Sequence, residues 1–354
     1  MPITRRNILV AGAALPILTS CATNLTKLRE QPVAVLAKDL GVCSAVYSVL
    51  RAAKPSTPIS VAGCDRSNAK PDAVFQAASL TKPVIAFGAL RLALAGELDI
   101  DAPVSRYLPA GYKHFHSALA RSPNDPHDIV PATALNRVTV AALLNHTSGL
   151  PNWASGPLSF NSVAGERWGY SGEGYVMLQS VIEAATGMEL SAYFGKHVFA
   201  EVGMPDTSLV WQDAYAALAV NGMSVFGGKR QIQFRQPVAA ASLYTTASDY
   251  AKFMSALLAD DRLVALTLSR PVQVDATLGL QWGLGWGIER AEGGPYLWQW
   301  GNNPGFRAFA MASVASKDGF VILTNSERGM PLAASVAHSV LPVNHNAFRF
   351  SWVA

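Results

Sequence analysis

The sequence predicts an α/β protein of the α+β type, with one antiparallel sheet built from both ends of the chain. Strand-like runs occur near both ends, at 42–50, 58–62, 296–302, 306–315 and 319–325. The middle of the chain instead carries helix candidates, at 139–145, 174–186 and 247–258. The economical arrangement joins both ends in one sheet flanked by helices, with a helical lobe inserted between them. A cleft would then lie between sheet and lobe.

Composition limits the classes of protein that fit. The chain has 354 residues, 50% hydrophobic and 15% charged, which allows a large core. The net charge of +4 is small and the basic residues are scattered, so we expect no nucleic-acid partner. His114, His116 and His127 lie in a polar loop without a Cys partner, and solvated surface histidines are expected there rather than a metal site. The sequence leaves the oligomeric state open.

The first residues are typical of an export signal. Arg5 and Arg6 form a charged start, and residues 8–18 are an apolar run too short to span a bilayer. The arginine pair resembles a twin-arginine signal, which would mean export in the folded state. We expect a signal peptide over 1–20 and a protein on the periplasmic side of a bacterial envelope.

A cysteine follows this signal. Leu18-Thr19-Ser20-Cys21 resembles a lipobox, in which Cys21 becomes the lipidated first residue. Ordinary cleavage near Ser20 with an incidental cysteine is the alternative. With a lipid, the protein would contact the membrane through that anchor only. Residues 21–40 would form a tether or a packed terminal helix, and residues 41–354 the folded domain.

Two more cysteines, Cys43 and Cys64, flank the first two strand-like runs. A hairpin would bring them opposite each other, and an oxidising compartment would allow a disulfide. Two small, unpaired core residues are the alternative.

A candidate nucleophile lies in the longest apolar stretch. Residues 74–96 are almost free of charge and predict a buried helix. Ser-x-x-Lys occurs twice, at Ser67–Lys70 in a polar loop and at Ser79–Lys82 near the start of this helix. Residues three apart on a helix share a face, so the Lys82 amine would lie above the Ser79 hydroxyl.

That pairing suits nucleophilic catalysis. A serine hydroxyl needs a neighbouring base, and a lysine in apolar surroundings has a lowered pKa. The helix N-terminus would add free N–H groups for a developing oxyanion. The alternative is an N-cap serine beside a lysine whose charge extends to the surface. Other catalytic patterns are weaker, because the chain has no Gly-x-Ser-x-Gly elbow and His146 has no evident Asp partner.

The motifs around Ser79 resemble those of class C β-lactamases and their esterase and peptidase relatives. The matches keep the order and spacing of that family and run from about residue 42 to residue 325. They comprise 75–82 (FQAASLTK), 96–109 (GELDIDAPVSRYLP), 143–151 (LLNHTSGLP), 243–249 (LYTTASD) and 283–286 (GLGW). The resemblance implies a β-lactamase/transpeptidase-like fold with a helical lobe.

The same resemblance places a second catalytic element at Tyr170. The family motif is Tyr-x-Asn, and this chain has Tyr170-Ser171-Gly172. A tyrosine next to a proton-sharing lysine can act as general acid and base. A core aromatic capping a loop is the alternative. Because Gly172 replaces the asparagine, recognition of a β-lactam is in more doubt than acyl transfer.

A third element is expected on a strand. The family motif Lys-Thr-Gly matches Gln299-Trp300-Gly301, although a register on Trp300-Gly301-Asn302 is the alternative. Gly301 would let the substrate lie along the strand. The N–H of Asn302 would join that of Ser79 in an oxyanion hole.

These features predict a serine hydrolase that forms an acyl-enzyme on Ser79 without a cofactor. Small esters or amides are the expected substrates. The alternatives are a β-lactamase or D-Ala-D-Ala-type peptidase of the cell wall, and a weakly catalytic binding protein that retains the fold.

Overall fold

The computed structural model describes residues 30–65, 70–118, 121–122, 124–226, 228–230 and 232–354. The expected signal peptide and Cys21 lie outside the described residues, as does Ser67 of the first Ser-x-x-Lys copy.

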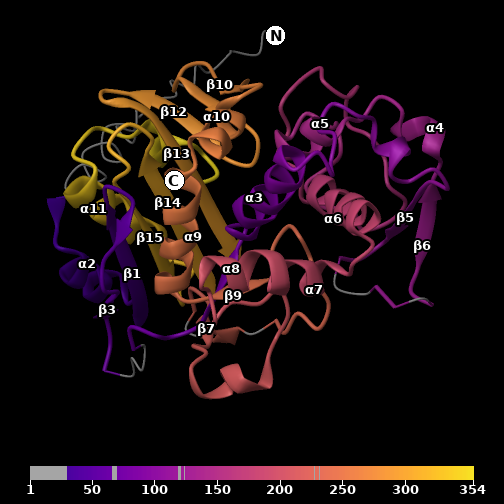
Figure 1. The fold of residues 1–354 in the computed structure, drawn as a ribbon. Helices are drawn as coiled ribbons and strands as arrows, with labels where there is room; N and C mark the ends of the chain where they lie inside the picture. Colours follow the sequence, from indigo (N-terminus) through magenta and orange to yellow (C-terminus); the bar gives the residue numbers. More distant parts are fainter. Residues whose placement is uncertain (1–29, 66–69, 119–120, 123, 227, 231) are drawn as a thin grey trace, which may run out of the picture.

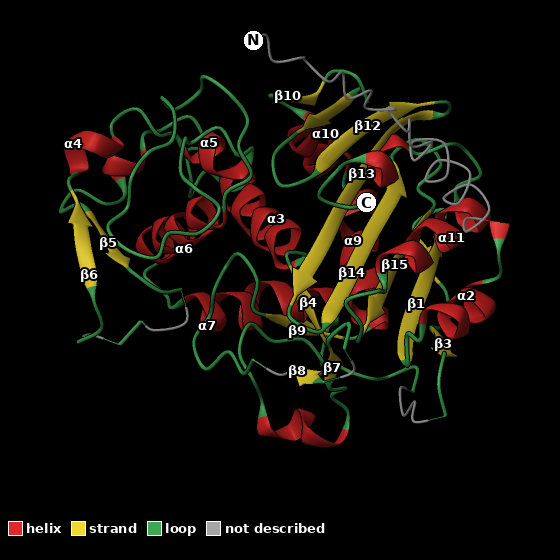
Figure 2. Ribbon diagram, turned by 180° about the vertical axis from the view of Figure 1, so that it is seen from behind, coloured by secondary structure: helices red, strands yellow, loops and turns green. Residues whose placement is uncertain are grey.

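The central element is an antiparallel sheet of nine described strands from both ends of the chain (Figures 1 and 2). Its order is β10-β11-β12-β13-β14-β15-β1-β2, and β3 also pairs with β1. The first part of the chain supplies β1 (Ser44–Arg51), β2 (Lys54–Pro55) and β3 (Ile59–Ala62). The last part supplies β10 (Val272–Asp275), β11 (Leu280–Trp282), β12 (Gly287–Ala291), β13 (Gly294–Asn303), β14 (Phe306–Ser313) and β15 (Gly319–Thr324). The predicted joining of both ends is confirmed.

The two faces of the sheet bury different side chains, because successive residues of a strand point to opposite faces. On β14, Ala308 and Ala310 face one core and Phe309 the other. The small side chains face α9 (Ala247–Ala259), whereas the aromatic face lies under α11 (Met330–Val340) and α2 (Val33–Leu40). Figures 1 and 2 show α9 on one face and the other two helices on the opposite face.

A helical lobe stands beside the sheet, as predicted, and α3 (Thr81–Leu94) lies between them (Figure 1). The lobe carries α4 (Ala132–Leu135), α5 (Val140–Leu144) and α6 (Gly172–Thr186), with the hairpin β5 (Tyr112–Phe115) and β6 (His127–Val130). Gly187 ends α6 in the left-handed conformation, at φ 66°.

Short elements connect these parts. Along the chain, the segment between α6 and β10 carries α9 and a series of shorter elements. These are α7 (Leu190–Phe194), the π-helical turn Gly195–Phe199, α8 (Ala200–Val202), the 3-10 turn Asp213–Ala217, β7 (Gly222–Met223), β8 (Lys229–Arg230), β9 (Leu243–Thr245) and α10 (Asp261–Leu268). Two further 3-10 turns are Val104–Arg106 and Asn346–Arg349.

The first described residues are packed rather than extended. Within the segment expected as a tether or a packed helix, residues 33–40 form α2, and Leu36 and Ala37 are fully buried. A tether is therefore the wrong description for this stretch. The apolar face that α2 turns to α11 and β3 explains the difference.

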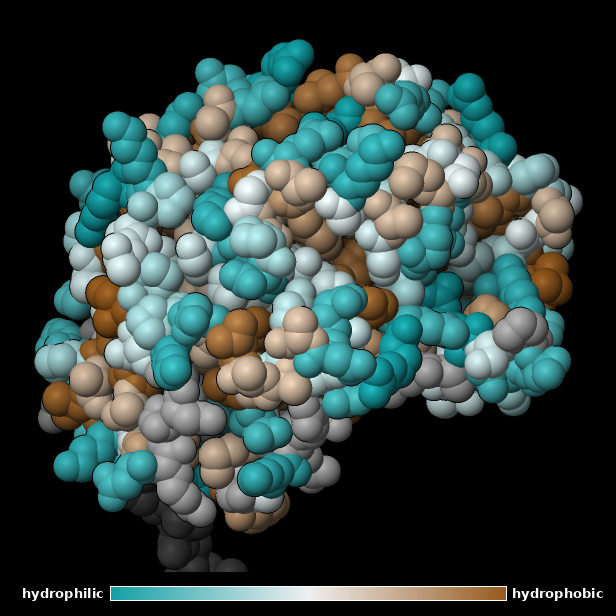
Figure 3. Space-filling view, turned by 60° about the horizontal axis from the view of Figure 1, so that its bottom comes forward, coloured by the Kyte–Doolittle hydropathy of each residue, from teal (hydrophilic) through white to brown (hydrophobic). Residues whose placement is uncertain are grey.

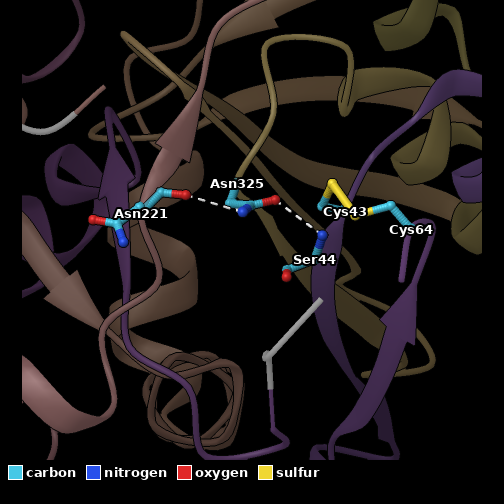
Figure 4. The surroundings of a disulfide bond; sticks show 5 residues. All are labelled: Cys43, Ser44, Cys64, Asn221 and Asn325. Atoms are coloured by element: carbon cyan, nitrogen blue, oxygen red, sulfur yellow. Dashed lines mark hydrogen bonds between the residues drawn. A yellow bond between two sulfur atoms is a disulfide. The ribbon is translucent and has the colours of Figure 1, made fainter. Parts of the chain in front are cut away.

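Cys43 and Cys64 form a disulfide that joins the start of β1 to the loop after β3 (Figure 4). Of the two expectations for these cysteines, pairing is the one that the structure has. Beside it, the Ser44 N–H donates to Asn325 Oδ1 at 2.9 Å, and Asn325 Nδ2 donates to the Asn221 carbonyl at 2.9 Å. The first strand is thereby fixed to the segment that follows β15.

Two sequence-based expectations are corrected. The expected helix over 74–96 begins only at Thr81, and Phe75–Ala78 is strand β4, paired with β9. Phe75 and Ala77 of β4 are buried in the same hydrophobic core as α3, so apolar character alone did not separate strand from helix. His114 is not a solvated surface residue, because it is 1% exposed and its Nδ1 lies 2.9 Å from Asp128 Oδ1.

Hydrophilic residues are spread among hydrophobic ones over the face that Figure 3 displays. Among the described helices, none is long and apolar enough to span a membrane.

Candidate active site

Ser79 lies in the turn between β4 and α3, at the border of sheet and lobe. Ala78, directly before it, has φ 51°, a left-handed conformation that is costly for a residue with a side chain. The Ala78 carbonyl accepts a hydrogen bond from Thr81 Oγ1 at 2.6 Å, which holds this conformation. The sharp turn leaves Ser79 partly exposed while its neighbours on both sides are buried.

Lys82 is fully buried one helical turn later. Its Nζ lies 3.1 Å from Ser79 Oγ and donates to the Ala240 carbonyl at 2.8 Å. Within the described part of the chain, no carboxylate forms a salt bridge with it. Burial lowers the pKa of Lys82 to about 7, so a large fraction of the amine is free near neutral pH. A free amine has the lone pair needed to accept the Ser79 proton.

Tyr170 is the third member of this group. Its ring centroid lies 4.7 Å from Lys82 Nζ, and its hydroxyl lies next to Ser79. Gln299 Nε2 donates to the same hydroxyl at 3.0 Å. Burial raises the pKa of Tyr170, and its polar contacts with Ser79 and Gln299 offset only part of that rise. The side chain is therefore a neutral phenol that can donate a proton to a leaving group.

The segment 143–151, the most specific motif of the sequence, holds the Tyr170 loop in place. The N–H of Gly169 donates to the His146 carbonyl at 2.8 Å, and the N–H of Ser171 donates to His146 Nδ1 at 3.1 Å. The His146 and Tyr170 rings lie 4.5 Å apart. Burial, with a smaller contribution from the charge of Lys82, holds the pKa of His146 well below its ordinary value. His146 is thus a neutral positioning residue, and sequence reasoning missed this role.

The strand β13 completes the group. Its partner β12 pairs with it only as far as Trp298, so residues 299–303 keep one edge that no described strand pairs with. A Cβ on Gly301 would overlap the Ala77 carbonyl oxygen and approach Ala78 Cβ to 3.2 Å. Only a glycine lets this edge lie so close to the nucleophile turn.

The three residues expected on this strand have different surroundings. Gln299 is fully buried, and its Nε2 also donates to the Trp300 carbonyl at 2.7 Å. Trp300 lies against Tyr170, with ring centroids 4.6 Å apart, and is 3% exposed. Asn302 is exposed. Gln299 therefore positions Tyr170, and it is this hydrogen bond that favours the Gln299-Trp300-Gly301 register.

Comparison with known proteins agrees with this geometry. A family model described as Beta-lactamase matches residues 51–344, most of the chain. The chain belongs to the beta-lactamase family.

Relatives within this family have diverse names. Esterase EstB of Burkholderia gladioli is 34% identical over 41% of this chain and 42% of the esterase. Penicillin-binding protein 4* of Bacillus subtilis (strain 168) is 31% identical over 39% of this chain and 31% of that protein. These alignments span less than half of either relative.

Several solved structures share the fold. A class C beta-lactamase superposes with a TM-score of 0.73 at 16% identity, covering 92% of this chain and 99% of that one. The D-alanine carboxypeptidase AmpC from Burkholderia cenocepacia gives 0.70 at 17% identity, covering 89% and 99%.

The departure from the beta-lactamase family pattern at Gly172 has a structural reason. A Cβ at this position would lie 2.5 Å from the Asn152 carbonyl oxygen and 3.0 Å from the Trp153 ring. The N–H groups of Gly172 and Glu173 both donate to that carbonyl, at 3.0 and 3.1 Å. The loop 151–153 thus occupies the space where the family motif has an asparagine side chain, and Trp153 places an aromatic surface there.

Proposed function

We propose that the chain is a serine hydrolase that forms an acyl-enzyme on Ser79 and hydrolyses small esters or amides. The observation that carries this proposal is the fully buried Lys82, whose Nζ lies 3.1 Å from Ser79 Oγ. A buried lysine without a carboxylate partner is costly to a fold. Such a lysine beside a partly exposed serine is typical of a catalytic site, where buried ionisable groups with shifted pKa values concentrate.

The proposed reaction starts with attack of Ser79 Oγ on the substrate carbonyl. The Lys82 amine accepts the serine proton, and Tyr170 donates a proton to the departing group. The N–H groups of Ser79 and Asn302 would stabilise the oxyanion, because both lie where β13 meets the start of α3. Water then hydrolyses the acyl-enzyme, and no cofactor is required by these steps.

Neutral esters are the proposed substrates. At the place where penicillin-recognising enzymes have a cation and a hydroxyl for a substrate carboxylate, this chain has a buried amide and an indole, at Gln299 and Trp300. A neutral amide binds a carboxylate less strongly than an ammonium does, and the amide here is already bonded to Tyr170. The likeness to a protein named as an esterase supports the same choice. A β-lactamase or a D-Ala-D-Ala-type peptidase is the second candidate, favoured by the fold it shares with proteins so named.

The test compares a nitrophenyl ester with a chromogenic cephalosporin. We expect kcat/KM for the ester to exceed that for the cephalosporin by at least about 100-fold. Ser79→Ala should lower ester hydrolysis by at least about 1,000-fold, while the control Ser67→Ala leaves it nearly unchanged. Efficient cephalosporin hydrolysis with poor ester turnover would favour the β-lactamase, and acylation of Ser79 without turnover would favour a binding protein.

We further propose that the protein is exported. The arginine pair and apolar run of residues 1–20 support a signal peptide, and the lipobox-like sequence ending at Cys21 supports a lipid anchor on the periplasmic side. The folded domain would then reach the membrane through that anchor only.

A further inference from the structure

A cavity of about 520 Å³ lies next to the catalytic group, on the side of Trp300. Three segments form it: the end of β13 with the start of β14, residues 327–331 at the start of α11, and residues 351–354. Its walls include Trp300, Asn302, Arg307, Glu327, Met330 and Trp352.

Trp352 connects this cavity to Tyr170. The ring centroid of Trp352 lies 5.5 Å from that of Tyr170 and 6.1 Å from that of Trp300. Tyr170 is therefore 7% exposed, whereas Trp352 itself is 47% exposed. The part of the indole that does not contact Tyr170 or Trp300 is available to an aromatic ligand.

The segment that carries Trp352 is held firmly. Glu289 of β12 is buried and accepts a hydrogen bond from the Asn346 N–H, while His345 Nδ1 lies 3.1 Å from its carboxylate. Phe350 packs 5.9 Å from the Trp300 ring, and the Val353 N–H donates to the Phe350 carbonyl at 2.8 Å. Such anchoring gives a fixed wall rather than a loose end.

The cavity favours a neutral ligand. Arg307 supplies a positive charge in its walls. Burial lowers the pKa of this guanidinium, and the nearby negative charge of Glu327 offsets part of that effect. Arg307 Nη1 also donates to the carbonyls of Asn303 and Phe306, at 3.2 and 2.9 Å. One positive and one negative side chain in the same wall leave little net attraction for a carboxylate.

We propose that Trp352 is a specificity-determining residue, and that its exposed indole forms the subsite for an uncharged aromatic leaving group. This inference rests on the proposed function. In acylation the Ser79 Oγ–C bond forms and the bond from that carbon to the leaving oxygen breaks. Lys82 accepts the serine proton, Tyr170 gives its own proton to the leaving oxygen, and the Lys82 ammonium then returns a proton to Tyr170. The leaving oxygen must therefore lie at the Tyr170 hydroxyl. From there the leaving group extends past Asn302, which lines the same cavity, to the exposed part of the Trp352 indole.

The test uses two esters with the same acyl group, benzyl acetate and ethyl acetate. We expect Trp352→Ala to lower kcat/KM for benzyl acetate about tenfold, mainly through KM, and to leave ethyl acetate within about twofold. Trp352→Phe should restore most of the loss because it keeps an aromatic surface. Hydrolysis of the acetyl-enzyme should be unchanged in both variants, since the leaving group has already departed.

Trp211 provides a control, because it is a partly exposed tryptophan that packs on Tyr215 and Tyr244 and does not line this cavity. Trp211→Ala should keep the native ratio of benzyl to ethyl ester hydrolysis. If Trp352→Ala also keeps that ratio while both esters acylate Ser79, the leaving-group subsite is wrong and the proposed function stands. If neither ester acylates Ser79, the proposed function fails, and the subsite with it.

Discussion

At the scale of single residues, burial sets the protonation state of both proton carriers. Desolvation disfavours the charged form of any group, so it lowers the pKa of Lys82 to about 7 and raises the pKa of Tyr170. Both side chains are thus neutral in a range around and above pH 7. A neutral amine is a base and a neutral phenol is an acid, which assigns acceptance of the serine proton to Lys82 and its return to Tyr170.

This assignment predicts the pH dependence of ester hydrolysis. The active form has a free Lys82 amine, which is lost as pH falls through about 7. We expect kcat/KM to be level above roughly pH 8 and to fall about tenfold per unit below roughly pH 6. Initial-rate assays from below pH 6 to above pH 8, corrected for spontaneous hydrolysis, measure this pH profile.

Lys82→Arg is the matched variant. A guanidinium keeps the positive charge and the donor to the Ala240 carbonyl but does not release its proton in this range. We expect a loss of at least about 100-fold at every pH. A variant that kept the native rate and profile would show that another group accepts the proton.

At the scale of elements, two glycine-mediated approaches shape the site. Gly301 brings β13 against β4, and Gly172 leaves room for the loop 151–153. Both act through backbone that comes too close for a Cβ. The site is therefore assembled by contacts between elements, in addition to the helix that carries Lys82.

Gly301→Ala tests the approach of β13 to the nucleophile turn. The new Cβ must push the strand away from Ala77, which displaces the oxyanion edge and the Gln299 contact to Tyr170. We expect kcat/KM for a nitrophenyl ester to fall by at least about tenfold in a folded protein. Circular dichroism establishes the fold, and steady-state assays measure the loss.

Gly169→Ala is its control. Gly169 also lies beside the catalytic group, but a Cβ there meets nothing within 4 Å. Its activity should stay within about twofold of native. Equal losses in the two variants would mean that any added methyl near the site is harmful, and that the close approach at Gly301 has no special role.

The disulfide between Cys43 and Cys64 belongs to the same scale. It closes a loop with a sequence separation of 21 around β1, β2 and β3, at the side of the sheet away from the catalytic turn. Cross-linking a loop of this length reduces the entropy of the unfolded chain, which corresponds to about 3 kcal/mol.

We therefore expect the double variant Cys43→Ala/Cys64→Ala to lower the free energy of unfolding by about 3 kcal/mol. Denaturant titration measures this change. The activity per folded molecule should not change, because neither cysteine touches the catalytic group. A variant of native stability but reduced activity would contradict the structural role.

At the scale of the whole molecule, the two ends of the chain build the sheet and the middle builds the lobe. The nucleophile turn lies where they meet, and residues from both sides converge on it. Lys82 comes from the helix between them, Tyr170 from the lobe and Gln299 from the sheet. The group forms only when the whole domain is folded, which fits proposed export in the folded state.

The proposed anchor predicts where the protein is found. Cys21→Ser should move it from the membrane fraction to the soluble periplasmic fraction, because the residue that would carry the lipid is removed. Fractionation followed by immunoblotting measures the change, and ester hydrolysis per molecule should be unaffected. Continued sedimentation of the variant with membranes would rule out lipidation at Cys21.

The sequence by itself determined the fold class and the family resemblance, and it predicted Ser79 instead of Ser67 as the nucleophile. Strand and helix patterns are local properties of the chain, and the motifs around Ser79 keep a fixed order and spacing. The spacing of Ser79 and Lys82 also predicted their contact, because the turn that leads into α3 brings residues three apart together, with the Lys82 N–H donating to the Ser79 carbonyl at 3.0 Å. The length of the expected helix over 74–96 was wrong, since a buried strand and a buried helix are equally apolar.

The tertiary structure alone decided the contacts between distant segments. Gln299 donates a hydrogen bond to Tyr170, and His146 accepts hydrogen bonds from the backbone on either side of Tyr170. Trp352 packs against the Tyr170 ring. No local pattern predicts such contacts, because they depend on how the sheet, the lobe and the last residues pack together. The same reason explains the burial of His114, whose polar surroundings in the sequence indicated the opposite. The contact between Ser79 and Lys82 could thus be predicted because three residues separate them, whereas the pockets around them arise from packing of the complete domain.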